Sequence, residues 1–443
     1  MRIQLSEHFT AAKLLRFVLP SVAMMIFTSI YGVVDGLFVS NFVGKTPFAA
    51  INLIMPFLMG LGALGFMIGT GGSALIARTL GEGDRERANR YFSMLLAVTV
   101  VSGLVLTVVG LVLLRPIAAA MGATDALMDD CVLYGRILLT FQTAFMLQNV
   151  FQSFFALAEK PKMGLGMTVA AGMTNIVLDA LFVAVFRWGL AGAAIATVIS
   201  QVVGGAVPLL YFARPNSSLL RLVKPRFDGR ALGKVCLNGS SELLTNLSTS
   251  LVSVLYNFQL MKLAGEDGVA AYGVLMYVNF IFLAIFFGYA IGSAPLISYH
   301  YGAGNRAELQ NLFRKSLLLM AGCGVVLTLL AEAVAAPLSR VFVGYDAALY
   351  EMTCHGFRLY ALSFLAAGLN VFGSAFFTAL NDGPVSAVIS FLRTLVFQVA
   401  VVLVLPVLFG IDGIWLAVTV AELLALAVTT SFLVGKRKKY RYA

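Results

Sequence analysis

The sequence has few charged residues for its length. Asp, Glu, Lys and Arg together make up 12% of the chain, whereas hydrophobic residues make up 60%, and the mean hydropathy is +0.92. An ordinary soluble domain has about 25% charged residues. Because many apolar runs of about 20 residues cannot all be buried in water, this shortage excludes a soluble domain and indicates an integral membrane protein.

Residues that build metal, redox and catalytic centres are also scarce. The four cysteines are scattered without a CxxC pair, and the three histidines are far apart in the sequence. No cofactor or metal centre is therefore expected. No hydrolase arrangement of Ser and His or of paired carboxylates is visible. The run Gly44-Lys45-Thr46 is not a nucleotide-binding loop, since Val39 stands where that motif requires Gly. The chain is expected to be neither an enzyme nor driven by ATP.

Twelve apolar segments follow one another, and each is long enough to cross a bilayer core of about 30 Å as a helix. The N-terminus lacks a short apolar core followed by a small-residue cleavage site, so we expect the first segment to be retained. The twelve segments lie at residues 14–43, 47–77, 91–114, 128–158, 163–186, 189–213, 235–262, 268–299, 312–336, 347–380, 384–408 and 410–435.

Positive charge is distributed unevenly between the connections. The termini and the even-numbered loops hold 22 Lys and Arg residues, and the odd-numbered loops hold 5. Because such residues collect on the cytoplasmic side, this bias predicts that both termini are cytoplasmic, in a prokaryotic inner membrane. The same bias accounts for the net charge of +10, so no nucleic-acid partner is expected.

The second half of the chain repeats the first at an offset of 221 residues. Residues 79–92 align with 300–313, residues 149–155 align with 370–376, and Gly189 aligns with Gly410. Since each half has six segments, both halves begin on the same side, as parallel repeats do. We therefore predict an all-α membrane protein of two six-helix bundles. The predicted units are an N-terminal lobe (1–213), a basic cytoplasmic linker (214–234) and a C-terminal lobe with a basic tail (235–443).

Two acids stand inside apolar segments of the N-terminal lobe. Asp35 and Asp179 both belong to the outer half of a segment, and Asn175 shares a helix face with Asp179. An acid at the centre of a membrane helix costs about 3 kcal/mol, so such residues are usually functional. We predict a cation-coupling site made of these three residues, which takes up a proton or a sodium ion. The alternative is that each acid is separately hydrogen-bonded or faces the outer interface.

A substrate cavity is predicted from polar and aromatic residues within the spans. Gln142, Phe145, Asn149 and Gln152 recur at three- and four-residue steps on the fourth segment. Such a stripe either lines a cavity or hydrogen-bonds neighbouring helices, and both interpretations stay open. Isolated charges such as Glu242, Glu422 and Arg393 are weaker candidates. The other residues assigned to the cavity are Thr28, Tyr31, Asn257, Asn279 and Asn370.

Several stretches resemble the multidrug and toxic compound extrusion (MATE) family, and the resemblance covers nearly the whole chain. The motifs that carry it lie at residues 19–40, 74–92, 159–182, 188–201, 239–257 and 408–424. The resemblance implies two six-helix lobes around a V-shaped cavity, and antiport of organic cations against protons or sodium. Asp35 and Asp179 stand where some members of the family are proposed to couple ions. Other members use acids on spans seven and ten, but span ten of this chain has none in its membrane part.

From this resemblance we expect a monomeric secondary transporter whose partners are amphipathic organic cations and the lipid bilayer. Its first span is expected to bend at Pro20 or Gly32 during transport. Two alternatives remain: a flippase of the same superfamily architecture that moves a lipid-linked precursor, and a major-facilitator carrier. The loop GEGDRER (81–87) lacks the spacing of basic residues that the second alternative requires.

Overall fold

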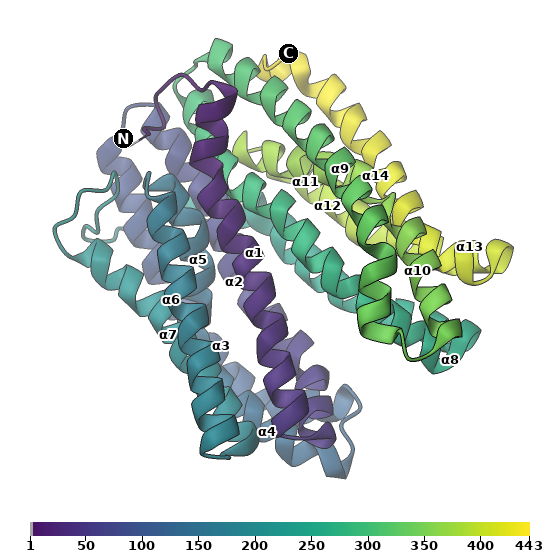
Figure 1. Ribbon diagram of the computed structural model, residues 1–443. Coiled ribbons are helices and arrows are strands. Elements are labelled where there is room, and N and C mark those ends of the chain that lie inside the picture. The colour runs from purple at the N-terminus through teal and green to yellow at the C-terminus, as the bar shows by residue number, and fades with distance from the viewer. Residues whose placement is uncertain (1–2) are drawn as a thin grey trace.

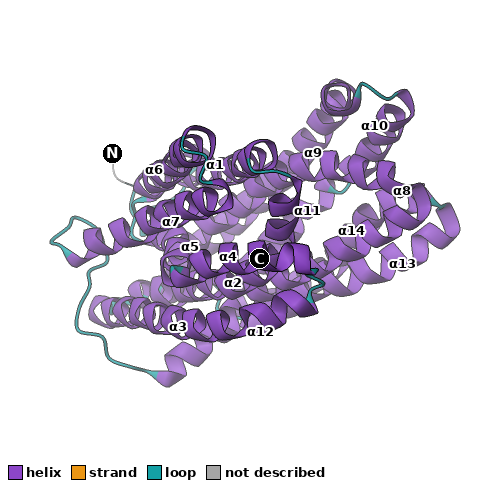
Figure 2. Ribbon diagram, turned by 90° about the horizontal axis from the view of Figure 1, so that it is seen from below, coloured by secondary structure: helices purple, strands orange, loops and turns teal. Residues whose placement is uncertain are grey.

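The computed structural model describes residues 3–443, and these are helical apart from short connections (Figure 1). No strand occurs among these residues (Figure 2). The first half contains α1 (Ala11–Phe42), α2 (Lys45–Gly81), α3 (Arg85–Ala120), α4 (Asp125–Thr140), α5 (Gln142–Leu157), α6 (Pro161–Asp179), the π-helical turn η1 (Ala180–Val185) and α7 (Gly189–Ala213). The second half contains α8 (Gly229–Gly302), α9 (Arg306–Val343), α10 (Ala347–Ala361), α11 (Phe364–Ala379), α12 (Gly383–Phe391), the π-helical turn η2 (Leu392–Val396), α13 (Phe397–Phe409) and α14 (Ile411–Tyr440).

The helices and the predicted spans correspond, but not one to one. Within the described chain, nine helices are long and apolar enough to cross a membrane, or ten if the bent pair α10–α11 is one span. Helix α8 has 74 residues and covers two predicted spans, which meet at a non-helical Gly265. The predicted fourth span is divided into α4 and α5, which have 16 residues each. Helix α8 also begins at Gly229, inside the predicted linker.

The internal repeat is visible in the backbone as well as in the sequence. Asp84 and Asn305 stand at matching positions, and each side chain caps the helix that follows by accepting a first-turn N–H, at 2.9 and 3.1 Å. Gly83 and Gly304 precede them with φ of 87° and 67°. Only glycine adopts this conformation without strain, so these turns require the glycines that the repeat retains.

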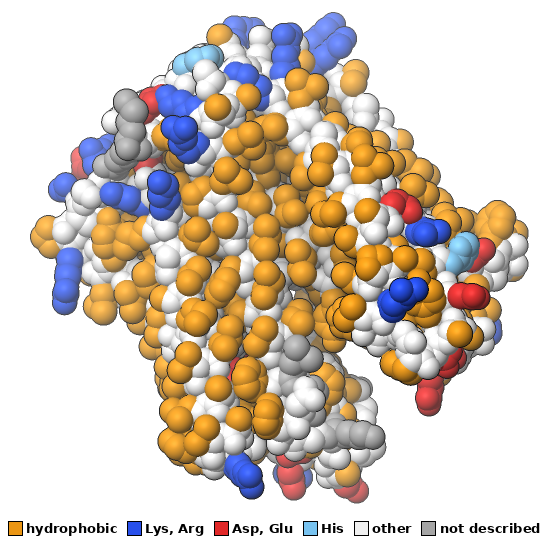
Figure 3. All heavy atoms as spheres, viewed as in Figure 1, with side chains coloured by type: hydrophobic (Ala, Val, Ile, Leu, Met, Phe, Trp, Pro, Cys, Tyr) orange, Lys and Arg blue, Asp and Glu red, His pale blue; other side chains and the backbone are white. Residues whose placement is uncertain are grey.

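The two halves form two lobes that diverge like the arms of a V. Helices α1–α7 build one lobe and α9–α14 the other, and both chain termini lie at the end where the lobes meet (Figure 1). The space-filling view shows a notch between the lobes at the opposite end (Figure 3). We call the two ends the terminal end and the open end. The V-shaped pair of bundles agrees with the predicted fold class.

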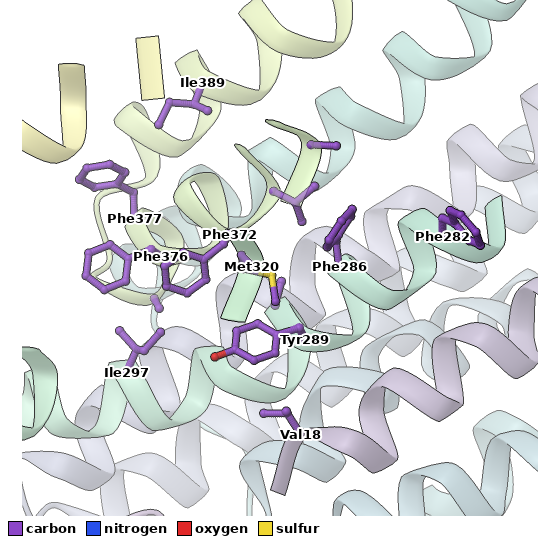
Figure 4. Packing of buried hydrophobic residues seen from close by; sticks show 14 of the residues in the cluster. Val18, Phe282, Phe286, Tyr289, Ile297, Met320, Phe372, Phe376, Phe377 and Ile389 are labelled. Carbon is purple, nitrogen blue, oxygen red and sulfur yellow. The ribbon is translucent and has the colours of Figure 1, made fainter. Parts of the chain in front are cut away.

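Close backbone contacts hold the lobes together at a seam formed by α1 and α2 against α8. A Cβ at Gly81 would lie 2.0 Å from the Tyr299 carbonyl oxygen, and one at Gly239 would lie 1.9 Å from the Met67 carbonyl oxygen. Glycine is required where two helix backbones approach this closely. Val18 of α1 lies beside Tyr289 of α8 in the same region (Figure 4). In this arrangement the terminal end of the molecule is closed.

An N-terminal strap, residues 3–10, crosses this closed end and contacts both lobes. The Leu5 backbone N–H donates to Glu159 Oε1 in the first lobe at 2.8 Å. The Phe9 backbone N–H donates to Glu308 Oε1 in the second lobe at 2.9 Å. The side chains of Leu5 and Phe9 are both fully buried. The strap is therefore part of the packed structure rather than a loose extension.

Candidate functional site

The candidate site lies where α1 and α6 pack side by side in the first lobe. Gly172 of α6 allows this approach, because a Cβ there would lie 2.4 Å from Phe27 Cε1 and 2.9 Å from Tyr31 Cδ1 of α1. Asp35 lies one turn after Tyr31 on α1, and Asp179 lies two turns after Gly172 on α6. These are the two acids predicted from the sequence. The packing thus places two carboxylates on facing helices.

Asp35 and Asp179 lie close enough to interact electrostatically, and Asn175 faces the Asp35 carboxyl group. Asp179 is completely buried and Asn175 is 2% exposed, whereas Asp35 is half-buried. The structure therefore brings together the three residues that the sequence analysis assigned to one site. Two carboxylates in a site with little water repel each other when both are ionised, which favours uptake of a proton or another cation.

Most of the polar atoms of this cluster have no hydrogen-bond partner among the described residues. These atoms are both carboxyl oxygens of Asp179, Oδ1 of Asp35 and Nδ2 of Asn175. Leaving one buried polar atom unpaired costs about 1–3 kcal/mol, and more for a charged group. Buried polar groups without partners are rare in proteins and call for an explanation. A bound proton or small cation would provide the missing interactions of the carboxyl oxygens.

Other polar groups surround the two carboxylates. Tyr134 of α4 is buried and interacts electrostatically with both of them, and its hydroxyl lies near Thr197 of α7. Tyr31 of α1 interacts with Gln148 of α5 and lies close enough to Asp35 to interact with it electrostatically. The π-helical turn η1 begins directly after Asp179. Such turns occur often at functional sites, since they shift the side chains that follow along the helix.

The donor atoms of this cluster are oxygens from carboxyl, hydroxyl and amide groups. Hard cations prefer such ligands. No group of three or more His, Cys, Asp and Glu side chains that could hold a metal ion occurs in the described part of the chain. A sodium ion bound by Asp35 and Asp179 remains a prediction.

The residues predicted to line the substrate cavity from the first lobe lie in different environments. Asn149 donates from Nδ2 to the Gly62 carbonyl oxygen of α2 at 3.3 Å, and the Phe145 ring packs against Gly62. Gln142 is 2% exposed at the beginning of α5. Gln152 lines a small internal cavity within the lobe. The stripe on α5 therefore packs against α2 over much of its length.

Thr28 and the three predicted cavity residues of the second half are also dispersed. Thr28 donates to the Met24 carbonyl oxygen of its own helix at 2.9 Å. Asn257 is exposed and Asn279 is 8% exposed, both on α8. Asn370 is fully buried inside the second lobe. The structure does not gather these residues around one cavity, and their role in binding substrate stays a prediction.

The predicted hinge residues both lie within one continuous helix. Helix α1 runs for 32 residues with Pro20 inside it, and Gly32 is exposed with nothing within 4 Å of where its Cβ would be. Proline removes one helical hydrogen bond and glycine is flexible, so both positions can bend at low cost. Bending at either of them stays a prediction.

A second charged cluster lies inside the second lobe and was only partly anticipated. Arg393, within η2, forms an ion pair with Glu422 of α14, with Nη2–Oε1 at 2.8 Å and Nε–Oε2 at 3.0 Å. Asn370 donates to Glu422 Oε2 at 2.7 Å. The side chains of Arg393 and Glu422 are 9% and 6% exposed. The sequence showed only that Arg393 and Glu422 each lie in an apolar span. Their separation along the chain did not show that they form a pair. Tyr134 and Gln148 carried no sequence signal at all.

Comparisons with known proteins agree with this architecture. The MatE family model matches residues 20–181 and 243–404. The multidrug export protein MepA of Staphylococcus aureus (strain MRSA252) is 23% identical over 419 residues, covering 94% of this chain and 91% of that protein. MepA of Staphylococcus saprophyticus is 22% identical and covers 92% of this chain and 90% of that protein.

Solved structures show the same fold. An outward-facing multidrug resistance MATE family transporter superposes with a TM-score of 0.93 at 22% identity, over 99% of this chain and 98% of that chain. A transporter from Pyrococcus furiosus, described as having a binding pocket of reverse polarity, superposes with a TM-score of 0.90 at 22% identity and the same coverage.

Proposed function

The chain belongs to the MatE family of membrane transporters, and from this premise we propose that it exports amphipathic organic cations in exchange for protons or sodium ions. The staphylococcal relatives named as multidrug export proteins support export of this kind. We further propose that it works as a monomer in a prokaryotic inner membrane.

The observation that carries the proposal is the pair of carboxylates Asp35 and Asp179 with unpartnered oxygens in the first lobe. With both acids ionised, the site carries two negative charges in a region of little water. Uptake of a proton removes one charge and relieves the repulsion between the carboxylates. A site with these properties can alternate between a coupling cation and a cationic substrate, because neutralising it weakens its attraction for a second cation.

Helix α1 provides a physical connection between this site and the seam. Val18 packs beside Gly292 of α8, where a Cβ would lie 3.1 Å from the Val18 Cβ. Asp35 lies 17 residues further along the same helix, or ~25 Å at 1.5 Å per residue. A change of charge at Asp35 that tilts or bends α1 would therefore also move the helix against α8. We propose that the lobes rock about this seam so that the cleft opens alternately to the two sides.

The distribution of charge supports an orientation with both termini in the cytoplasm. Lys and Arg side chains gather at the terminal end, whereas the middle of the molecule is covered by hydrophobic side chains (Figure 3). The cleft at the open end would then face outward. An exchange that moves one net charge inward, such as two protons for one monovalent organic cation, gains about 2.3 kcal/mol from 100 mV, which can sustain a concentration ratio of about fifty.

Ethidium efflux from proteoliposomes tests the proposal, with a pH gradient and a sodium gradient imposed separately. We expect efflux under at least one gradient and its loss in both Asp35→Asn and Asp179→Asn. The matched control is Glu266→Gln, which removes an exposed acid of α8 outside the cluster. Efflux of the control should equal that of the unchanged protein.

The gradients also separate the alternatives. Efflux driven only by sodium would assign sodium as the coupling ion and leave the site unchanged. Normal efflux in Asp35→Asn would contradict coupling at this site. Absence of ethidium efflux under both gradients would favour the lipid-linked precursor flippase, which movement of a labelled lipid precursor would then test.

A further inference from the structure

A polar cavity of about 320 Å³ opens at the terminal end, far from the carboxylate pair. Its walls come from five separate parts of the chain, one of which is the connection between α5 and α6 that holds Glu159. Ser6 belongs to the N-terminal strap, Arg85 begins α3, Ser218 and Arg221 belong to the segment after α7, and Tyr299 belongs to α8. The cavity therefore touches both halves of the molecule.

Hydrogen bonds hold the wall formed by residues 214–228 in place. The Asn216 Oδ1 atom accepts from the Ser218 backbone N–H at 3.0 Å. The Arg221 backbone N–H donates to Asn89 Oδ1 of α3 at 3.0 Å, and the side chain of Leu220 is fully buried. This connection is thus packed against the first lobe, although its composition predicted only a basic linker.

The cavity carries an excess of positive charge. The side chains of Arg85 and Arg221 form no hydrogen bond or ion pair with any described residue. Lys160 lies next to the cavity, with Nζ 3.0 Å from the Ser217 hydroxyl oxygen. Glu159 is the acid among the lining residues, and it already accepts the Leu5 N–H. Two unpaired guanidinium groups at one cavity are suited to bind an oxyanion, since guanidinium and phosphate match in charge and geometry.

The second half of the chain fills the corresponding place with aromatic side chains. At the offset of 221 residues, Arg221 corresponds to Tyr442, which is fully buried, with its ring centroid 4.8 Å from that of Phe313 and 4.9 Å from that of Phe376. Arg85 corresponds to Arg306 at the beginning of α9. The pair of arginines at the cavity is therefore not repeated in the second half, and the cavity is not a consequence of the repeated fold.

We propose that this cavity binds a phosphate group, supplied either by the headgroup of an anionic phospholipid or by a free phosphate. The bound phosphate bridges Arg85 and Arg221 and fills the space between the strap, the connection after α7 and α8. Because a ligand stabilises the arrangement that binds it, an occupied cavity favours the arrangement in which the terminal end is closed. This site shares no residue with the carboxylate pair, so phosphate binding can be tested without relying on the proposed transport function.

Binding to the purified full-length protein tests the proposal without a transport assay. Titration calorimetry of the protein in a neutral detergent measures the binding of inorganic phosphate. Sodium chloride of equal ionic strength is the reference titrant. Native mass spectrometry measures the binding of the lipid, with the protein in phosphatidylcholine nanodiscs that either contain or lack phosphatidylglycerol. Saturable binding of either probe, weakened at least tenfold in both Arg85→Gln and Arg221→Gln, is the expected result. The probe that binds identifies the source of the phosphate.

Arg306→Gln is the matched control, since it removes the repeat-related arginine outside the cavity. Its affinity should equal that of the unchanged protein. Equal weakening in this control would show that binding reflects general surface charge, and absence of saturable binding of both probes would likewise overturn the proposal. Arg221→Lys keeps the charge without the guanidinium geometry and should lose less affinity than Arg221→Gln does.

Discussion

The buried ion pair of Arg393 and Glu422 allows a prediction about the effect of single substitutions on stability. Arg393→Met removes the cation and leaves Glu422 buried with Asn370 as its remaining described partner. Breaking a buried pair in this way costs about 3–5 kcal/mol, because the remaining charge is uncompensated. We expect the free energy of unfolding in mixed detergent to fall by about that amount.

The double variant Arg393→Met with Glu422→Leu provides the control for this prediction. Replacing a buried pair by apolar residues of similar volume is often close to neutral. The double variant should therefore be considerably more stable than Arg393→Met alone. If both variants lose the same stability, the packing of these side chains matters more than their charge.

The residues of the candidate site show how much of it can be predicted from the sequence alone. Asp35, Asp179 and Asn175 were predicted to lie together because their depth and helical spacing follow from the chain. The role of the polar stripe on α5 could not be predicted in the same way, because residues that line a cavity and residues that contact a neighbouring helix have the same spacing. Asn149 uses its amide to contact Gly62, which only the arrangement of α2 and α5 reveals.

The N-terminal strap makes a prediction at the scale of one element. Glu308 accepts the Phe9 N–H at 2.9 Å and lies 2.6 Å from His8 Nδ1, so Glu308→Ala removes the main attachment of the strap to the second lobe. A hydrogen bond to a charged group contributes about 1.5–3 kcal/mol. We expect the Phe9 amide to exchange with deuterium at least about tenfold faster, measured by mass spectrometry of N-terminal peptides.

Glu332→Ala is the control for the strap, because it removes an acid of the same helix α9 far from Phe9. Exchange at Phe9 should stay unchanged in this variant. Unaltered exchange in Glu308→Ala would mean that Asn311 and Lys315, which also donate to the Phe9 carbonyl oxygen, hold the strap on their own.

The positions of the helices were easier to predict than their continuity, since α8 joins two predicted spans and α4 and α5 divide one. Helices α3 and α9 begin at Arg85 and Arg306, directly after the capping residues Asp84 and Asn305 and six residues before the predicted spans. No proline or glycine marks the break between α4 and α5, where the chain turns at Phe141. Breaks of this kind depend on the helices packed around them, so local sequence does not reveal them.

The two lobes of the whole molecule had a sequence signature, but the seam between them did not. An offset that held across both halves predicted two similar bundles. The sequence has many glycines. It does not show which of them, such as Gly81 and Gly239, lie at contacts between the lobes and which lie at helix contacts within one lobe. Only the structure shows which helices meet, and this contact defines the axis about which the lobes would move.

A disulfide across the seam tests that motion directly. A Cβ at Gly292 would lie 3.1 Å from the Val18 Cβ, slightly below the 3.5–4.5 Å that disulfides span. Val18→Cys with Gly292→Cys, in a protein whose four native cysteines are replaced, should therefore crosslink under mild oxidation. If the terminal end must open during each cycle, the crosslinked protein should lose at least about nine-tenths of its efflux, and reductant should restore it.

A crosslink within one lobe distinguishes a blocked motion from general damage. Gly103→Cys with Thr143→Cys joins α3 to α5, where the corresponding Cβ separation is 3.0 Å. Because both helices belong to the first lobe, rocking of rigid lobes leaves this pair together, and efflux should be the same before and after oxidation. Full efflux with the Val18–Gly292 pair crosslinked would instead show that the seam stays closed throughout transport. The substrate would then have to pass by bending of α1 within one lobe, and Pro20 or Gly32 would become the place to look for the motion.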